Sequence, residues 1–458
     1  MLWRHLRLVR AWSAAGLISS LTFIAVPAVA GEPAEPLPAA EARVETVKIL
    51  DAKKAGELTV DLRGHGQSGV TMAIKNTSTR RLNVVLPAGL VAASSVGQAA
   101  GGGAGGGGGL QNMGLGAPGN RPGGFGQFGA NNAANGVGFR SVGLSAESNT
   151  SSVMVGAGQS VEIEMPAVCL NFGMPSPTPK DSLTLLDVND YSRDPRVRRA
   201  LRSLATIGTS QGTAQATMWN VCNNVPFETM LTQGEKIVNR HEVALASRFI
   251  EALDASTASD VVDPAYLTEA RVFVTVVGEK GLEKDAQRIS TELEGLRLLG
   301  LPVRVSGAKD LPMTSGPALH LLVSLVESKV GETSVKVGVR YASGINKSSE
   351  WQPLGGANFK ETSAASAIKG VDVVRGLDHA VASAFVSVKP ARKAVGSTAM
   401  RIENRLPFTL ASVTLKAGSS SGSPPVTFAG LGIGPARNGN VSIQAPTATV
   451  DRVELNGL

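Results

Sequence analysis

The stretch "SSVMVGAGQSVEIEMPAVCL", residues 151–170, decides the fold of the first half of the chain. Val161, Ile163 and Met165 alternate with two glutamates, which is the period of a β-strand with one buried face. The earlier segments "GELTVDLRG", "GVTMAIKN" and "RRLNVVLPAG" are also short and alternating, and they are bounded by Gly, Asn or Pro. The pattern predicts a small antiparallel β-sandwich over residues 43–169.

Two segments of unusual composition precede and interrupt this β-unit. Residues 31–42, "GEPAEPLPAAEA", are rich in Pro and Ala and are expected to form a flexible leader. Residues 97–138 include "GGGAGGGGG" and contain Arg121 as their one charged residue. Such a segment buries too little apolar surface to offset its ordering entropy, so we expect a disordered Gly-rich insertion between two strands.

The hydrophobic period changes after the β-unit. "DPRVRRALRSLATIG" places Val197, Leu201 and Leu204 at helical spacing, with Asp194 as N-cap and Pro195 at the first helical position. "TAQATMWNVCNN" and "KIVNRHEVALASRFIEALDAS" follow as two further helices. These segments predict a helical domain over residues 170–258.

The second half of the chain alternates strands with helices. "ARVFVTVVG", "LEKDAQRISTELEGLRLLG" and "PVRVSG" give a strand, a helix and a strand, and a hairpin and a closing helix follow them. This order predicts an α/β sandwich over residues 267–390, which resembles the small α/β domains of TolB-type periplasmic proteins. Short alternating strands return over residues 398–458 as a C-terminal β-domain. The expected fold class is therefore multidomain α+β.

The N-terminus indicates export. Three arginines in "MLWRHLRLVR", an apolar stretch and the small-residue site Ala28-Val29-Ala30 form the pattern of a cleavable signal peptide over residues 1–30. No later segment is apolar enough to cross a bilayer, so no integral membrane segment is expected after cleavage. The signal and the composition look bacterial, and the mature protein is expected in the periplasm, on the cell surface or outside the cell.

The charge of the chain argues against nucleic acid as a partner. Removal of residues 1–30 takes away three arginines and no acids, so the net charge falls from +7 to +4. The one basic cluster, "RDPRVRRALR", has no interleaved aromatic residues that could stack on bases. We therefore interpret this cluster as a solvated helix face.

The two cysteines, Cys169 and Cys222, are the main candidates for covalent chemistry. An even number of cysteines in an exported chain favours a disulfide, and this one would fasten the β-unit to the helices with about 4 kcal/mol. Gln215 lies on the helix of Cys222 but about 10 Å earlier along the axis. Since bonded residues need Cα atoms within about 7 Å, Cys169 can bond to Cys222 or to Gln215, but not to both. Two unpaired thiols are the third alternative. Met218 and Trp219 are expected to share the stripe of Gln215 and Cys222 and to pack in the core.

Residues 150–225 resemble the thioester domains of bacterial surface adhesins, or their relatives that lack the thioester. The likeness lies in "AVCLN" at a strand end and "AQATMW" on a following helix. In that family a Cys and a Gln side chain condense to an internal thioester, which nucleophiles then open. The resemblance implies Cys169 as the thiol, Gln215 as the acyl partner and Trp219 packed over the bond. The chain departs from the family at Ala214, where the pattern has Thr, and at Cys222.

Other motifs carry little chemistry. "GHGQSG" at 64–69 lacks the second Gly of a nucleophile elbow and predicts a hairpin turn, and "GLGIGP" at 430–435 runs into a proline and predicts a turn. The four histidines of the mature chain are too far apart in sequence to suggest a metal site, and neither cofactor nor catalytic residue is predicted. Their positions are His65, His241, His320 and His379.

These observations predict an exported, non-enzymatic binding or scaffold protein that a Cys169–Cys222 disulfide stabilises, with an unidentified protein or surface glycan as its partner. The alternative is an adhesin that forms a covalent link through Cys169 and Gln215. A third hypothesis places an enzyme on the domain over residues 267–390.

Overall fold

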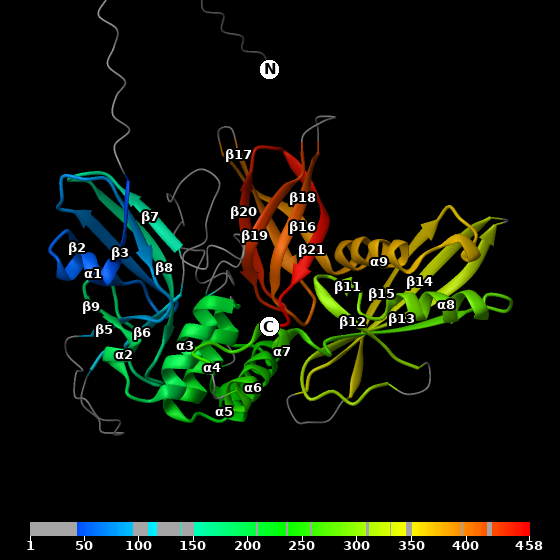
Figure 1. The fold of residues 1–458 in the computed structure, drawn as a ribbon, viewed down its shortest axis with the longest axis horizontal. Coiled ribbons are helices and arrows are strands. Elements are labelled where there is room, and N and C mark those ends of the chain that lie inside the picture. The colour runs from blue at the N-terminus through cyan, green and yellow to red at the C-terminus, as the bar shows by residue number, and fades with distance from the viewer. Residues whose placement is uncertain are drawn as a thin grey trace, which may run out of the picture. The chain divides into compact units, whose positions relative to one another are not determined.

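The computed structural model describes residues 44–94, 109–116, 139, 151–207, 209–234, 237–256, 259–307, 311–329, 331–344, 350–394, 397–418 and 424–458 (Figure 1). The predicted signal peptide and leader lie outside these residues, as does most of the Gly-rich segment. In the described part, helices and several sheets combine in a mixed α+β fold, which confirms the α+β part of the predicted class.

The first β-unit is a closed barrel with a small sheet beside it. The barrel strands follow one another in the order β2 (Leu58–Gly64), β3 (Gly69–Asn76), β8 (Ser160–Cys169), β6 (Met113–Leu115), β5 (Leu90–Ser94) and β9 (Ser182–Asp187). The small sheet has the order β1 (Glu45–Lys48), β4 (Leu82–Leu86) and β7 (Ser151–Val155), and α1 (Ile49–Lys54) follows β1. The predicted two-sheet sandwich is therefore closed into a barrel, because β9, from the segment expected to be helical, pairs with both β2 and β5.

Strand β6 corrects the expectation of disorder for the whole of residues 97–138. It lies inside that segment and pairs with β5 on one side and with β8 on the other. Met113 and Leu115 are fully buried in the barrel core, so this short apolar stretch offsets the entropy of ordering it. The surrounding residues are mostly glycine, so the composition of the segment gave no sign of a strand.

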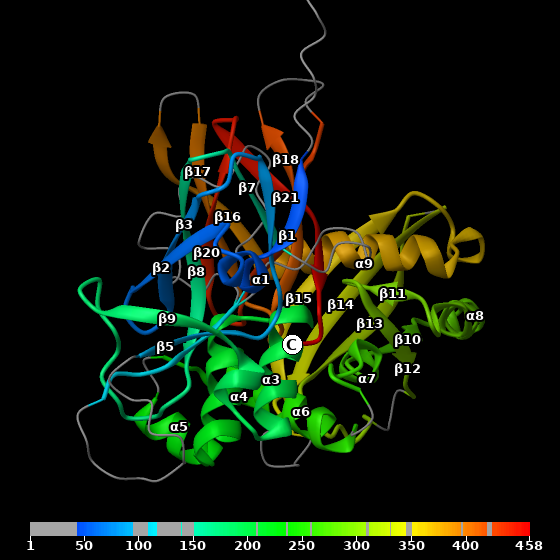
Figure 2. The ribbon, with the colours of Figure 1, turned by 60° about the vertical axis from the view of Figure 1, so that its left-hand side comes forward.

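The helical unit has the three predicted helices and shorter ones between them: α2 (Val188–Tyr191), α3 (Pro195–Ile207), α4 (Gln211–Asn223), α5 (Phe227–Gln233), α6 (Arg240–Ala255) and α7 (Pro264–Thr268). Asp194 accepts a hydrogen bond from the backbone N–H of Arg196 at 2.8 Å, as expected for the cap of α3. Ser210 caps α4 through the N–H of Thr213. Helix α4 packs against α3, α6 and strand β8 (Figure 2).

The α/β unit is a six-stranded sheet with helices packed against its core face. Its elements are β10 (Val272–Gly278), α8 (Glu283–Leu293), β11 (Arg297–Leu298), β12 (Leu301–Val305), β13 (Ala318–Lys329), β14 (Glu332–Ala342), β15 (Trp351–Glu361), η1 (Ala365–Ala367) and α9 (Gly370–Phe385). The strand order is β11-β12-β10-β13-β14-β15, and β10 runs parallel to β12 and β13. The predicted hairpin is β13–β14, and β15 extends it into an antiparallel meander.

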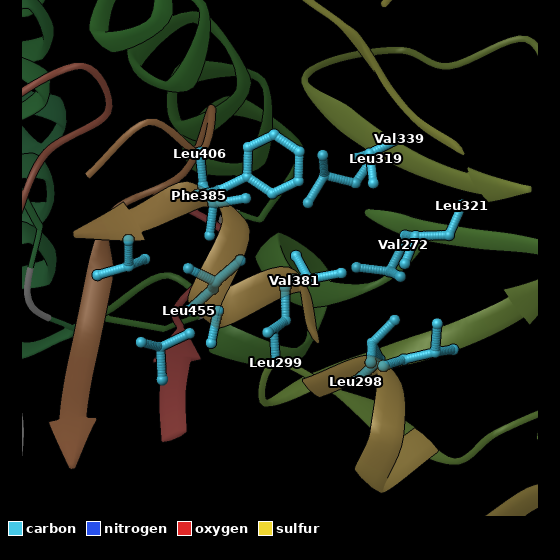
Figure 3. Packing of buried hydrophobic residues seen from close by; sticks show 14 of the residues in the cluster. Val272, Leu298, Leu299, Leu319, Leu321, Val339, Val381, Phe385, Leu406 and Leu455 are labelled. Carbon is cyan, nitrogen blue, oxygen red and sulfur yellow. The ribbon is translucent and has the colours of Figure 1, made fainter. Parts of the chain in front are cut away.

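Two three-stranded sheets follow α9, and their first strand lies before residue 398, where the C-terminal β-domain was predicted to begin. Their orders are β16 (Val386–Ala394), β17 (Ser397–Asn404), β20 (Asn438–Ile443) and β19 (Val426–Ile433), β18 (Leu410–Gly418), β21 (Thr447–Leu455). These sheets share one hydrophobic core with the α/β unit. Figure 3 shows Val381 and Phe385 of α9 between Leu319 of the large sheet and Leu455 of β21. The two predicted domains therefore bury a continuous apolar interior.

Candidate functional site

At its C-terminal end, strand β8 pairs with a strand on one side only. Strand β3 pairs with β8 from Lys75 opposite Ser160 to Gly69 opposite Pro166, and β3 begins there. On the other side, β6 pairs with the last three residues of β8, from Ala167 to Cys169. The backbone groups of these three residues that face the β3 side need other partners, because unpaired buried backbone groups are costly.

The N–H of Ala167 donates to the carbonyl oxygen of Ser68 at 2.9 Å, and side-chain amides of helix α4 supply the other partners. The backbone N–H of Cys169 donates to Oε1 of Gln215 at 2.9 Å, and Nε2 of Gln215 donates to the carbonyl oxygen of Cys169, also at 2.9 Å. One turn earlier, Nε2 of Gln211 donates to the carbonyl oxygen of Ala167. The two amides thus hydrogen-bond with β8 beyond Pro166, where β3 no longer lies beside it.

The contact continues along the helix at a spacing of four residues. The ring of Trp219 meets that of Phe172 edge-on, with centroids 5.0 Å apart, and Oδ1 of Asn223 accepts from the N–H of Phe172 at 3.0 Å. Positions four apart lie on one side of a helix. The end of β8 and the residues that follow it therefore lie beside α4 from its first residue to its last.

The Cys169 thiol faces the barrel rather than the helices. Its side chain belongs to the barrel core, whereas its neighbours Val168 and Leu170 belong to the helical core. The thiol donates a weak hydrogen bond to the carbonyl oxygen of Gln67, 3.4 Å away. Gln67 lies in the turn between β2 and β3, so "GHGQSG" is the hairpin turn that the sequence predicted. Burial raises the pKa of the Cys169 thiol to about 12.

The predicted disulfide is not formed, and both cysteines are free. Cys222 packs at the edge of the helical core and lies near Tyr191 and Asp194. Cys169 instead meets Gln215, which lies about 10 Å before Cys222 along the helix axis. The count of cysteines suggested a bond, but the Cys169 side chain lies in the barrel core and Cys222 packs against the helical core.

The predicted stripe on α4 is divided between two cores. Met218 packs in the helical core with Leu204 and Phe249, and Trp219 packs in a separate cluster with Met230 and Val243. Trp219, which the resemblance expects to cover the bond, lies one turn beyond Gln215 and packs against Phe172. Gln211, Asn223 and Gln67 were missed, although the amides at 211, 215 and 223 fall on the same four-residue spacing.

The remaining predicted features have structural explanations. His320 is 3% exposed and its Nε2 lies 2.9 Å from Oγ1 of Thr275, and burial lowers its pKa to about 4. Within the described residues, no group of His, Cys, Asp or Glu is arranged to hold a metal ion. In the basic cluster, Arg196 pairs with Asp254 and Arg202 with Asp187.

No known protein family, curated protein or solved structure matches this chain. None of the helices in the described part of the chain combines the length and the apolar character that a membrane crossing requires.

Proposed function

We propose that this protein is an exported binding protein that attaches covalently to its partner through an internal thioester between Cys169 and Gln215. The observation that carries the proposal is the pair of 2.9 Å hydrogen bonds between the Gln215 amide and the two backbone groups of Cys169. Since both bonds go to one residue, the amide carbon of Gln215 lies opposite the Cα that bears the thiol. The disulfide that would have consumed this thiol is absent.

Formation of the bond needs no added reactant. Sγ of Cys169 attacks Cδ of Gln215, the C–N bond breaks, and the thiol proton leaves with the nitrogen as ammonia. The backbone N–H of Cys169 already donates to Oε1, where negative charge develops during the attack. The thiol faces the barrel core in this structure, so it first gives up its weak bond to the Gln67 carbonyl and turns toward α4. Holding the two groups together makes the step intramolecular, which favours it strongly.

Burial would keep such a bond intact until a partner reaches it. Gln215 is 2% exposed and Cys169 is 1% exposed, so little water has access to the reacting atoms. The raised thiol pKa also disfavours departure of the thiolate. A partner's amino or hydroxyl group would attack Cδ, form an amide or ester with Gln215, and return the proton to Sγ of Cys169. A lysine-bearing protein or a surface glycan has the required chemistry.

A second function is favoured by Gln211, which makes the same kind of bond to β8 although no cysteine lies beside it. In this alternative the amides only complete the strand edge, and the protein is a non-covalent scaffold. The expected export, with cleavage after Ala30, is common to both functions, and the resemblance of residues 267–390 to TolB-type α/β domains is compatible with either.

Capture of an amine probe distinguishes the two. The exported protein is incubated with a biotinylated alkylamine, denatured, and probed for biotin, beside Gln215→Ala and Gln211→Ala. The covalent proposal predicts labelling of the wild type and of Gln211→Ala, mapped to residue 215, and none of Gln215→Ala. An unlabelled wild type that retains its full mass would support the scaffold instead.

A further inference from the structure

The turn between β19 and β20, residues 434–437, lies against the helices that carry the candidate site. Arg437 donates to the carboxylate of Glu242 from Nε at 3.1 Å and from Nη2 at 2.8 Å. Beside it, Nδ2 of Asn239 donates to the carbonyl oxygen of Pro435 at 2.9 Å. The C-terminal β-domain is therefore fastened to the beginning of α6.

The carboxylate of Glu242 also packs closely against the first turn of α4. Glu242 is 1% exposed and lies beside the hydroxyl of Ser210, the cap of α4. A Cβ on Gly212 would lie 2.2 Å from the carboxyl carbon of Glu242, and a Cβ on Gly434 would lie 2.8 Å from Cβ of Ser210. Two glycines thus permit the 434–437 turn, Glu242 and the start of α4 to meet without side chains between them.

The 434–437 turn is also hydrogen-bonded to a residue that follows α9, Asn404. The buried Asn404 donates from Nδ2 to the carbonyl oxygen of Gly434 at 3.0 Å, and its N–H donates to the carbonyl oxygen of Arg437 at 2.9 Å. Asn404 also donates to the carbonyl oxygens of Phe408 and Ile433. The position of Arg437 is therefore set by the C-terminal β-domain.

We infer that Arg437 is a positioning residue for the Cys169–Gln215 bond. The 434–437 turn and Glu242 fix the first turn of α4, and Gln215 follows on the next turn of the same helix. A helix moves as a rod over so short a distance, so a shift at Ser210 moves the amide away from Cys169. The inference rests on the proposed function, and a misplacement of about 1 Å is enough to slow such a reaction about a hundredfold.

The first test measures ammonia loss from the full exported chain by intact mass over time. Arg437→Gln is expected to slow the loss about tenfold to a hundredfold, and Arg437→Lys, which keeps the charge but loses the paired donors, should lie between. The matched control is Arg452→Gln, because Arg452 pairs with Glu454 on the exposed side of the same domain. An Arg437→Gln chain with the wild-type rate overturns the inference.

Arg437→Gln leaves a buried carboxylate unpaired, and the resulting loss of stability could slow the reaction by itself. A second variant separates this effect from the loss of positioning. Glu242→Gln combined with Arg437→Gln removes the unpaired charge and is expected to restore the melting temperature. The double variant should still lose ammonia at least about tenfold more slowly than the wild type, because the paired donors are gone. A folded double variant with the wild-type rate counts against Arg437.

The second test does not depend on the bond. In a Cys169→Ala background, which cannot form a thioester, hydrogen exchange is followed at the amides of residues 211–217. Arg437→Gln should speed exchange there about tenfold, and Arg452→Gln should leave it unchanged. If the wild type keeps its ammonia, the proposed function fails, and this exchange still decides whether Arg437 positions α4; unchanged exchange overturns the inference.

Discussion

The side-chain amide of Gln215 pairs with both backbone groups of Cys169, at 2.9 Å in each direction, in the way that a neighbouring strand would. Gln211 extends this pairing to Ala167, so α4 closes the edge of β8 at the point where β3 ends. The same arrangement supports the barrel and holds an acyl group beside a cysteine. These two consequences can be tested separately.

Loss of the Gln215 amide should destabilise the protein even when no covalent bond can form. In a Cys169→Ala background, Gln215→Ala leaves the N–H and the carbonyl of residue 169 unpaired in a buried place, which is expected to cost about 2–4 kcal/mol. The matched control is Gln287→Ala on the exposed face of α8, with a change within about 0.5 kcal/mol. Urea denaturation measures both, and equal effects would show that the amide pairing contributes nothing.

Reductant should not change the number of thiols that can be alkylated. No disulfide joins Cys169 and Cys222, so iodoacetamide added in denaturant should label the same number of sites with and without a reducing agent, whether or not Cys169 is held in the proposed thioester. Peptide mapping by mass spectrometry reads out each site. Two sites that appear only after reduction would restore the disulfide.

The sequence predicted the elements that depend only on the spacing of apolar residues along a short segment. Alternation identified β8, and apolar spacing with Asp194 and Pro195 identified α3 and its start. Closure of the barrel was not predictable, because β6 is three residues long inside a Gly-rich segment and β9 precedes helices in the chain. The disulfide was predicted from compartment and cysteine count, neither of which specifies where the two thiols lie, and both cysteines are free in the structure. Which side chain faces Cys169 depends on how α4 lies against β8, and that is a tertiary property.

Gly212→Ala should destabilise the protein, although Ala is the better helix former by about 1 kcal/mol. A Cβ at this position would collide with the carboxylate of Glu242, at 2.2 Å from its carbon, and this ion-paired side chain cannot move freely. We expect a loss of about 1–3 kcal/mol in thermal or chemical unfolding. Gly307→Ala is the control, since no atom of the described residues lies within 4 Å of a Cβ there. A stabilised Gly212→Ala would mean that the contact is loose.

His320 should make stability depend on pH in the acid range. Its folded pKa is lowered to about 4 from 6.5 by burial, with a further contribution from Arg340. Between these pH values the unfolded chain binds a proton that the folded chain does not. The free energy of unfolding therefore falls as the pH drops from 6.5 to 4, by at most about 3 kcal/mol from this group.

Denaturation of His320→Gln across this pH range checks the assignment. The variant should have a flatter dependence than the wild type, and His379→Gln, at an exposed position on α9, should keep the wild-type slope. If His320→Gln also keeps that slope, other groups are responsible for it.

Intact-mass analysis of the exported protein tests the proposed bond most directly. The account predicts a chain lighter than its sequence by one ammonia, which gains one methylamine when that amine is added, and neither change in Gln215→Ala or Cys169→Ala. A wild-type chain of full mass that methylamine leaves unaltered would contradict the thioester, and the Gln215 amide would then be only a support for the edge of β8.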